Sequence, residues 1–231
     1  MIDITKDAQF GELDFKYEKC KGVRSYKPVP ETDPETVQQA AQLINNAKKP
    51  MIVFGQGVIL GEAEEELKDF VEKSGIPAAW TILGLSALPT AHPLNVGMVG
   101  MHGNYGPNRL TNECDLLVAI GMRFDDRVTG NLETYAKQAK IIHFEIDPAE
   151  VNKNVEVDVA VMGNVKNTLA EILPLVEPKT HENWLQEFKD FDTVEYEKVI
   201  KDELYPSKEG LSMGEVSVSY THLTLPTTSR V

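Results

Sequence analysis

The sequence has few cysteines and a shortage of positive charge, and each shortage excludes a class of protein. Only Cys20 and Cys114 occur in 231 residues. Two cysteines are too few for a disulfide framework, and neither has the Cys/His spacing of a metal site. The sequence has 23 basic and 36 acidic residues, which gives a formal net charge of −13. We therefore expect no metal site and no nucleic-acid or anionic-membrane partner.

Long hydrophobic runs are also missing. No apolar run approaches the roughly 20 residues that span a bilayer, and the first residues lack the basic and apolar stretches of a secretory signal. We therefore expect a cytoplasmic protein. At 231 residues, the chain is long enough to bury one substantial core.

What is present is an alternation of short apolar runs with helical patterns. In residues 33–49, for example, Val37, Ala40, Ala41 and Ile44 share one helix face. We expect strands at 51–54, 76–82, 114–121, 139–147 and 155–163, and helices at 33–49, 61–75, 108–113 and 165–176. This alternation predicts an α/β fold, with a doubly wound, mostly parallel sheet and helices on both faces.

The pattern divides the chain into four parts. Residues 34–178 form the expected central α/β domain, and residues 179–216 form a helical linker towards a further domain. Before them, residues 1–33 read as the end of a preceding domain, with the last part of a strand at 1–7, followed by a linker. Residues 217–231 change abruptly to Ser, Thr and Leu. This tail resembles translated vector or adapter sequence, so we expect it to be non-native.

Candidate ligand residues follow the expected strands, because ligands of open α/β sheets bind at the carboxyl ends of the strands. The turn "GQG" (55–57) follows the first strand, and "GMRFDDR" (121–127) follows the third. Arg123 and Arg127 could bind a diphosphate through paired hydrogen bonds. Two plainer readings remain open. A glycine pair also suits a tight turn, and "RFDDR" also suits a surface loop with internal salt bridges.

Two features of the sequence argue against NAD as the bound nucleotide. The first turn, "GQGVILG", is G-x-G-x-x-x-G rather than the G-x-G-x-x-G of NAD-binding sheets. Trp80 and Thr81 stand where an acidic ribose ligand would be expected. A standard NAD site is therefore not expected. His102 could be a base or a ligand, but it has no partner at metal spacing, so a structural or cofactor-packing role is favoured, and His92 and His143 are read as structural.

Several segments together resemble a known family. "KKPMIVFGQGV", "TILGLSALP", "VGMVGMHG", "CDLLVAIGMRFDDRVTGN" and "IIHFEIDPAEVNKN" occur in this order. They resemble the Rossmann-like central domain of the catalytic subunit of acetolactate synthase (acetohydroxyacid synthase), over residues 1 to about 216. This family uses thiamine diphosphate and Mg²⁺. It is a transferase that condenses pyruvate with a second 2-ketoacid in branched-chain (isoleucine and valine) biosynthesis, and its central domain binds FAD without net redox chemistry.

The resemblance implies particular site residues. It implies no catalytic residue and no metal ligand within this chain, but a substrate channel bordered by Lys6, Met101 and Asp126. The sequence departs from the family at Asn164, where the family usually has Asp, and in "IDITKD", which keeps Lys6 but lacks the family's proline. The implied FAD-binding residues are Gly55, Gly57, Thr81, Leu83, Gly84, Met101, His102, Gly103, Gly121, Arg123, Asp125, Arg127, Val128, Glu145, Ile146 and Asn164.

The resemblance also implies parts that this chain lacks. The family's thiamine-activating glutamate lies in an N-terminal domain, and its Gly-Asp-Gly motif, which holds Mg²⁺ and diphosphate, lies in a C-terminal domain. No Gly-Asp-Gly occurs here. We therefore expect a fragment that is inactive alone, from a homodimer or homotetramer with a regulatory small subunit. The alternatives are a related thiamine-diphosphate oxidase or decarboxylase, against which "RFDDRVTG" argues, and a stand-alone nucleotide-binding module.

Overall fold

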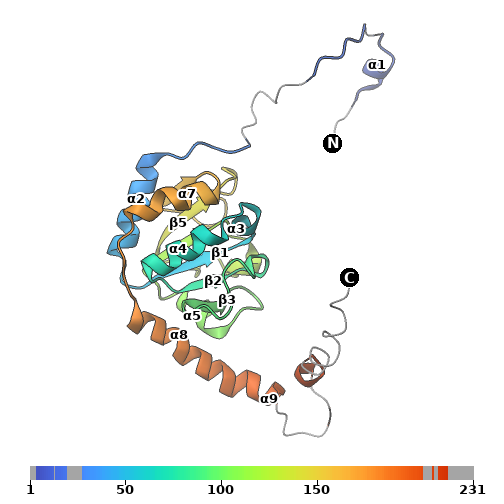
Figure 1. Cartoon of the computed structure of the whole chain (residues 1–231). Helices are drawn as coiled ribbons and strands as arrows, with labels where there is room; N and C mark the ends of the chain where they lie inside the picture. The colour runs from blue at the N-terminus through green and yellow to red at the C-terminus, as the bar shows by residue number, and fades with distance from the viewer. Residues whose placement is uncertain (1–3, 13, 20–27, 205–209, 211–212, 218–231) are drawn as a thin grey trace, which may run out of the picture.

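A single parallel sheet forms the centre of the computed structural model, which describes residues 4–12, 14–19, 28–204, 210 and 213–217. The sheet has six strands in the order β3-β2-β1-β4-β5-β6, and every neighbouring pair is parallel (Figure 1). The predicted doubly wound α/β fold is thus confirmed. The strands are β1 (Pro50–Phe54), β2 (Ala78–Trp80), β3 (Asn95–Met98), β4 (Leu116–Ile120), β5 (Lys140–Glu145) and β6 (Val159–Met162).

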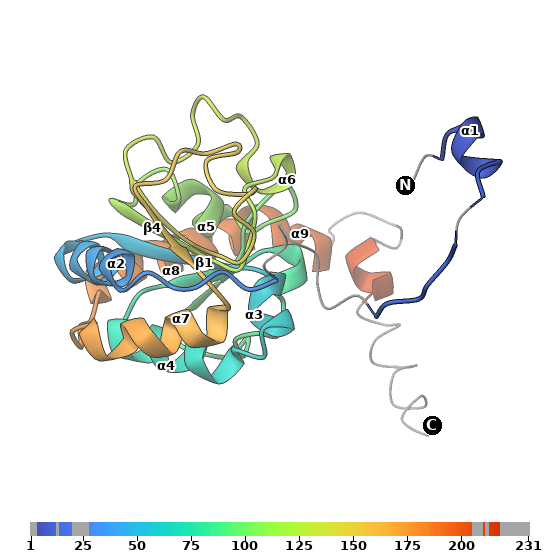
Figure 2. The ribbon, with the colours of Figure 1, turned by 90° about the horizontal axis from the view of Figure 1, so that it is seen from above.

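Helices cover both faces of the sheet. The core on one face joins apolar residues of α2, α4 and α7 to Ile52 and Phe54 of β1, whereas the core on the other joins α5 and α8 to Met51 and Val53 (Figure 2). Because both faces are buried, the strands read as continuous apolar runs. The helices are α1 (Lys6–Gln9), α2 (Pro34–Asn46), α3 (Gln56–Leu60), α4 (Glu64–Ser74), η1 (Ile82–Gly84), α5 (Tyr105–Leu110), α6 (Asp126–Thr129), α7 (Val165–Ile172), η2 (Leu173–Leu175), α8 (Glu182–Glu195), η3 (Tyr196–Ile200) and α9 (Lys201–Leu204).

The structure corrects several of the expected elements. Strand β3 was not predicted, because its four residues, "NVGM", include Gly97 at a φ of +102° and pair irregularly with β2. The expected strand end at 1–7 is wrong where it is described, since Lys6–Gln9 is helical. The expected strand at 155–163 begins only at Val159. No helix in the described part of the chain is long and apolar enough to cross a membrane.

Helix α8 lies in the range expected to be a linker, yet it packs on the sheet. Trp184 and Phe188 are 3% and 0% exposed. The indole N–H of Trp184 donates to the carbonyl of Pro50 at 2.8 Å, and Lys49 pairs with Glu187 at 2.8 Å. The boundary at 178 stays a prediction, but α8 adds apolar side chains to the core of the sheet. The suspected non-native tail falls outside the described residues from 218 onwards.

Candidate functional site

The turns after β1 and β4 meet at the carboxyl edge of the sheet. The amide of Gly57 donates to the carbonyl of Gly121 at 2.8 Å. A Cβ atom at Gly57 would lie 2.7 Å from the Cα of Gly121, and Gly121 itself has a φ of +56°. Glycine is required at both positions, because a side chain at either one would collide with backbone. The close approach of the two turns is therefore enough to explain a glycine at residue 57 of "GQG", as the tight-turn interpretation expected.

A small cavity opens beside these glycines, and we call it the edge cavity. Its volume is about 130 Å³. It brings together residues that follow β1, β4, β5 and β6, all of them at the sheet edge where ligands of this fold bind. The expected cofactor residues that line it are Gly57, Gly121, Glu145, Ile146 and Asn164.

Glu145 provides the carboxylate of the edge cavity. It is 9% exposed, and its Oε1 accepts hydrogen bonds from the amides of Ile146 and Asp147 at 2.8 and 3.1 Å. The Nε2 of His143 lies 3.4 Å from its Oε2. Burial raises the pKa of Glu145, but the hydrogen bonds from His143 and the two amides outweigh burial and lower it overall. The charged carboxylate can accept hydrogen bonds from the hydroxyl groups of a sugar.

Glu145 should make the stability of the protein depend on pH. A depressed native pKa stabilises the folded state above the ordinary value of 4.5, and this contribution is lost as the pH falls through the native pKa. We expect Glu145→Gln to lower the free energy of unfolding near neutral pH, and the difference from the unaltered protein to shrink as the pH falls below the ordinary value of 4.5 and through the lower native pKa. Urea unfolding across this range tests it, with exposed Glu156→Gln as the control. A difference that stayed constant with pH would contradict the assignment.

Asn164 keeps one function that the family's aspartate would also perform. Its Oδ1 accepts a hydrogen bond from the amide of Lys166 at 2.9 Å and thereby caps helix α7. Asn and Asp are both favoured at this position of a helix. The departure from the family thus leaves the cap intact. What changes at the edge cavity is the other side-chain atom, because the second carboxylate oxygen of an aspartate would accept a hydrogen bond whereas the NH2 group of Asn164 donates one.

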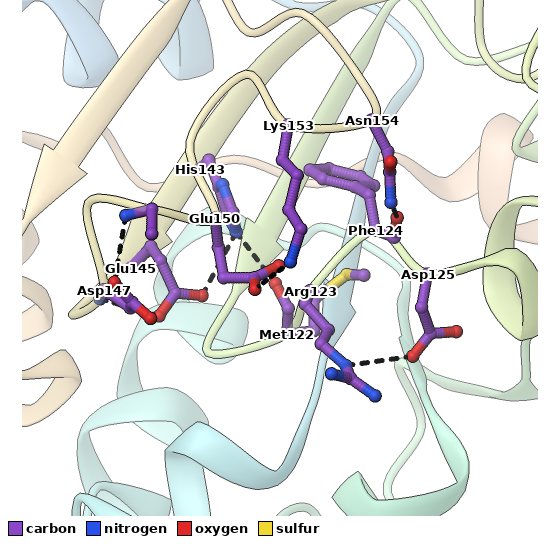
Figure 3. Close-up of polar contacts among 11 residues, drawn as sticks. Met122, Arg123, Phe124, Asp125, His143, Glu145, Asp147, Glu150, Lys153 and Asn154 are labelled. Atoms are coloured by element: carbon purple, nitrogen blue, oxygen red, sulfur yellow. Dashed lines mark hydrogen bonds and ion pairs between the residues drawn. The ribbon is translucent and has the colours of Figure 1, made fainter. Parts of the chain in front are cut away.

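Arg123 and Asp125 form the salt bridge that the plainer reading of "RFDDR" expected (Figure 3). The Nε of Arg123 lies 3.2 Å from Oδ2 of Asp125, and the Arg123 side chain is 66% exposed. The other carboxylate oxygen, Oδ1, accepts from the amide of Arg127 at 3.0 Å and caps α6. An exposed pair of this kind contributes little stability, so Arg123 stays available to a ligand.

A second cavity, the loop cavity, lies beside α5 and α6 and has a volume of about 350 Å³. Met101 and Asp126, both expected at the substrate channel, line it together with Arg127 and Val128, which were expected at the cofactor. The Nη1 of Arg127 lies 3.7 Å from the sulfur of Met101. Among the described residues, no carboxylate forms an ion pair with Arg127. Its charge is therefore open to a ligand.

Other expected site residues are scattered around the same edge. Thr81 is buried, whereas Leu83 and His102 are exposed, and a Cβ at Gly84 or Gly103 would meet backbone. Lys6 is exposed on α1, which lies apart from the sheet (Figures 1 and 2), so this structure does not bring Lys6 to Met101 and Asp126.

The sequence interpretation missed some residues at this edge. Leu60 lines the edge cavity and is 75% exposed, and Ile82 and Leu85 flank Leu83 with 68% and 54% exposure. Their only signal in the sequence is an apolar side chain directly after a predicted strand or turn. His143 was read as structural, and its long-range contacts left no sequence signal at all.

Known proteins resemble this chain over most of its length. A family model described as "Thiamine pyrophosphate enzyme, central domain" matches residues 37–172. The acetolactate synthase large subunit of Corynebacterium glutamicum is 44% identical over 173 residues, which cover 75% of this chain and 28% of that protein. The probable large subunit of Methanocaldococcus jannaschii is 44% identical over 191 residues (80% and 32%), and isozyme 1 of Escherichia coli is 39% identical over 185 residues (80% and 32%).

These matches confirm the resemblance that the motifs indicated. The chain spans 28% to 32% of the length of these relatives. The matched residues run from α2 through α7 and include all six strands of the sheet. The chain therefore belongs to the family of thiamine pyrophosphate enzymes, with the family's central domain at residues 37–172.

Proposed function

We propose that this chain is the central, FAD-binding part of a cytoplasmic acetolactate synthase, which condenses pyruvate with a second 2-ketoacid. The edge cavity supports the proposal most directly, because glycine backbone, the Glu145 carboxylate and the Asn164 amide meet there from separate strands. The names of the relatives, together with "FDDRVTG" at residues 124–130, favour this activity over other reactions of the family.

The side chains at the edge suit the two polar parts of FAD. Glu145 is a carboxylate, which accepts hydrogen bonds from ribose hydroxyls and repels phosphate. Arg123 and Arg127 carry positive charge that the protein leaves largely unused, and guanidinium groups bind diphosphate well. We propose that Glu145 and Ile146 hold the adenosine end and that the arginines hold the diphosphate.

The catalytic groups belong to other parts of the proposed enzyme. Thiamine diphosphate would supply the carbanion that attacks the ketoacid, held with Mg²⁺ by the neighbouring domains. This chain would bind and orient FAD and, with Met101 and Asp126, border the path of the substrate. We also propose a homodimer or homotetramer with a regulatory small subunit.

Arg127 gives the test of the FAD assignment. The experiment uses the protein read from the gene across both ends of this chain, which we call the extended protein. Arg127→Ala should weaken FAD binding by about 1.5 to 3 kcal/mol, the range for hydrogen bonds to charged groups, as measured by fluorescence titration of FAD. Lys140→Ala is the matched control, because Lys140 is exposed at the start of β5, on the opposite sheet edge.

The two variants lose the same charge, so a general electrostatic effect would weaken FAD binding in both. A selective loss in Arg127→Ala supports direct binding. FAD affinity that is unchanged in Arg127→Ala would leave "RFDDR" as a surface loop with internal salt bridges.

A further inference from the structure

Side chains of β5 and of the loop after it bind the carbonyls of the residues before and after Arg123 (Figure 3). The Nε2 of His143, on β5, lies 2.8 Å from the carbonyl oxygen of Met122. The Nδ2 of Asn154, in the loop after β5, donates to the carbonyl of Phe124 at 2.7 Å. A carbonyl oxygen can only accept, so the Nε2 of His143 carries the proton of this bond.

The neighbours of Arg123 are buried, while its own side chain is not. Met122 and Phe124 are each 4% exposed, and the Phe124 ring meets the His143 ring edge-on at 5.1 Å. The Arg123 side chain is 66% exposed, and its one polar partner within the described chain is Asp125. The peptide unit before Arg123 and the one after Phe124 are therefore held, and the guanidinium of Arg123 faces away from the core.

His143 is a costly residue for this position unless its donor is needed. It is fully buried, and its Nδ1 has no hydrogen-bond partner among the described residues. An apolar side chain of similar size would avoid that cost. An apolar side chain could not donate a hydrogen bond to the Met122 carbonyl, nor could it make the polar contact at 3.4 Å with the Glu145 carboxylate. His143 thus connects the loop after β4 with the carboxylate after β5.

We propose that His143 and Asn154 are positioning residues for Arg123. They anchor the carbonyls of residues 122 and 124, so that the guanidinium is already directed towards the diphosphate when FAD arrives. A loop whose backbone is fixed before binding loses less conformational freedom on binding, which raises affinity. This inference rests on the proposed FAD function, because it assigns these two residues an effect on FAD affinity that is transmitted through Arg123.

A double-mutant cycle in the extended protein tests the inference. Asn154 is exposed, so Asn154→Ala should leave the fold intact. We expect this variant to bind FAD about threefold to tenfold more weakly, the range for one neutral hydrogen bond, and to have no further effect when Arg123→Ala is already present. Asn45→Ala is the control, because it also removes a side-chain amide that donates a hydrogen bond to a carbonyl, that of Leu175 at 2.9 Å, together with an acceptor for the amide of Glu177 at 2.9 Å. Asn45 lies on α2, before β1, at the other sheet edge.

The His143 side chain adds a second comparison. His143→Gln can retain an N–H donor near Met122, whereas His143→Leu cannot, so FAD affinity should be higher in the glutamine variant even where both variants are less stable. Equal affinity in these two variants would overturn the role of His143. The role of Asn154 would be overturned if Asn154→Ala weakened FAD binding equally with and without Arg123, or did not weaken it at all.

The outcomes also separate the inference from the proposed function. If the unaltered extended protein binds no FAD, the proposed function fails and the inference fails with it. If it binds FAD and Arg123→Ala weakens binding, but the cycle is additive, the inference alone fails.

Discussion

The 231-residue chain should form no acetolactate when it is given pyruvate, thiamine diphosphate, Mg²⁺ and FAD. Carboligation needs a deprotonated thiamine carbon and a held Mg²⁺-diphosphate, and the sequence has no Gly-Asp-Gly to hold the latter. Proton transfer by a positioned group alone contributes about 10²- to 10⁴-fold in rate, and electrostatic preorganisation contributes as much or more. Without the groups that provide both, turnover should be absent rather than slow.

A colorimetric acetoin assay measures this result, with a reaction that lacks protein as the blank. The extended protein, assayed in parallel, should form acetolactate under the same conditions. Acetolactate from the 231-residue chain above the blank would mean that the catalytic groups lie within this sequence.

Helix α8 should be indispensable for stability. Phe188 is 0% exposed and packs with Trp184 at 5.1 Å in the core that contains Met51 and Leu110. Phe188→Ala removes this buried ring and leaves a cavity, so we expect the free energy of unfolding to fall by about 3 to 5 kcal/mol. Urea unfolding of the 231-residue chain measures it, as a lower midpoint with an unchanged slope.

Lys189→Ala is the matched control for Phe188→Ala. Lys189 follows Phe188 on α8 and is exposed, so its truncation should change stability by about 0.5 kcal/mol or less. If Phe188→Ala lowered the free energy of unfolding no more than Lys189→Ala does, then α8 would be an attached linker and not a layer of this fold.

The sequence predicted those elements whose cause is local. The buried runs at 51–54 and 116–120 read as strands because both faces of the sheet are covered and every residue is apolar. Strand β3 could not be read this way, since Gly97 interrupts its short run and its place depends on pairing with β2. The docking of Trp184 was likewise invisible, because its bond to Pro50 spans 134 positions of sequence.

The candidate site shows the same division. The rule that ligands bind after parallel strands led to Gly57, Gly121 and Glu145, and the structure gathers them at the edge cavity. It could not separate the edge cavity from the loop cavity, because the path of the chain after α6 decides where Arg127 and Met101 meet. Nor could it find the bond from His143 to Met122, which only the pairing of β4 with β5 creates.

The most direct test is isothermal titration calorimetry of the extended protein with FAD and, separately, with NAD. We predict that FAD binds and that NAD does not, because the first turn is G-x-G-x-x-x-G and Trp80 and Thr81 offer no carboxylate to an NAD ribose. The 231-residue chain alone should bind FAD weakly or not at all, since neighbouring domains would cover part of the flavin. NAD binding that is tighter than FAD binding in the extended protein would contradict the assignment of this sheet edge to FAD.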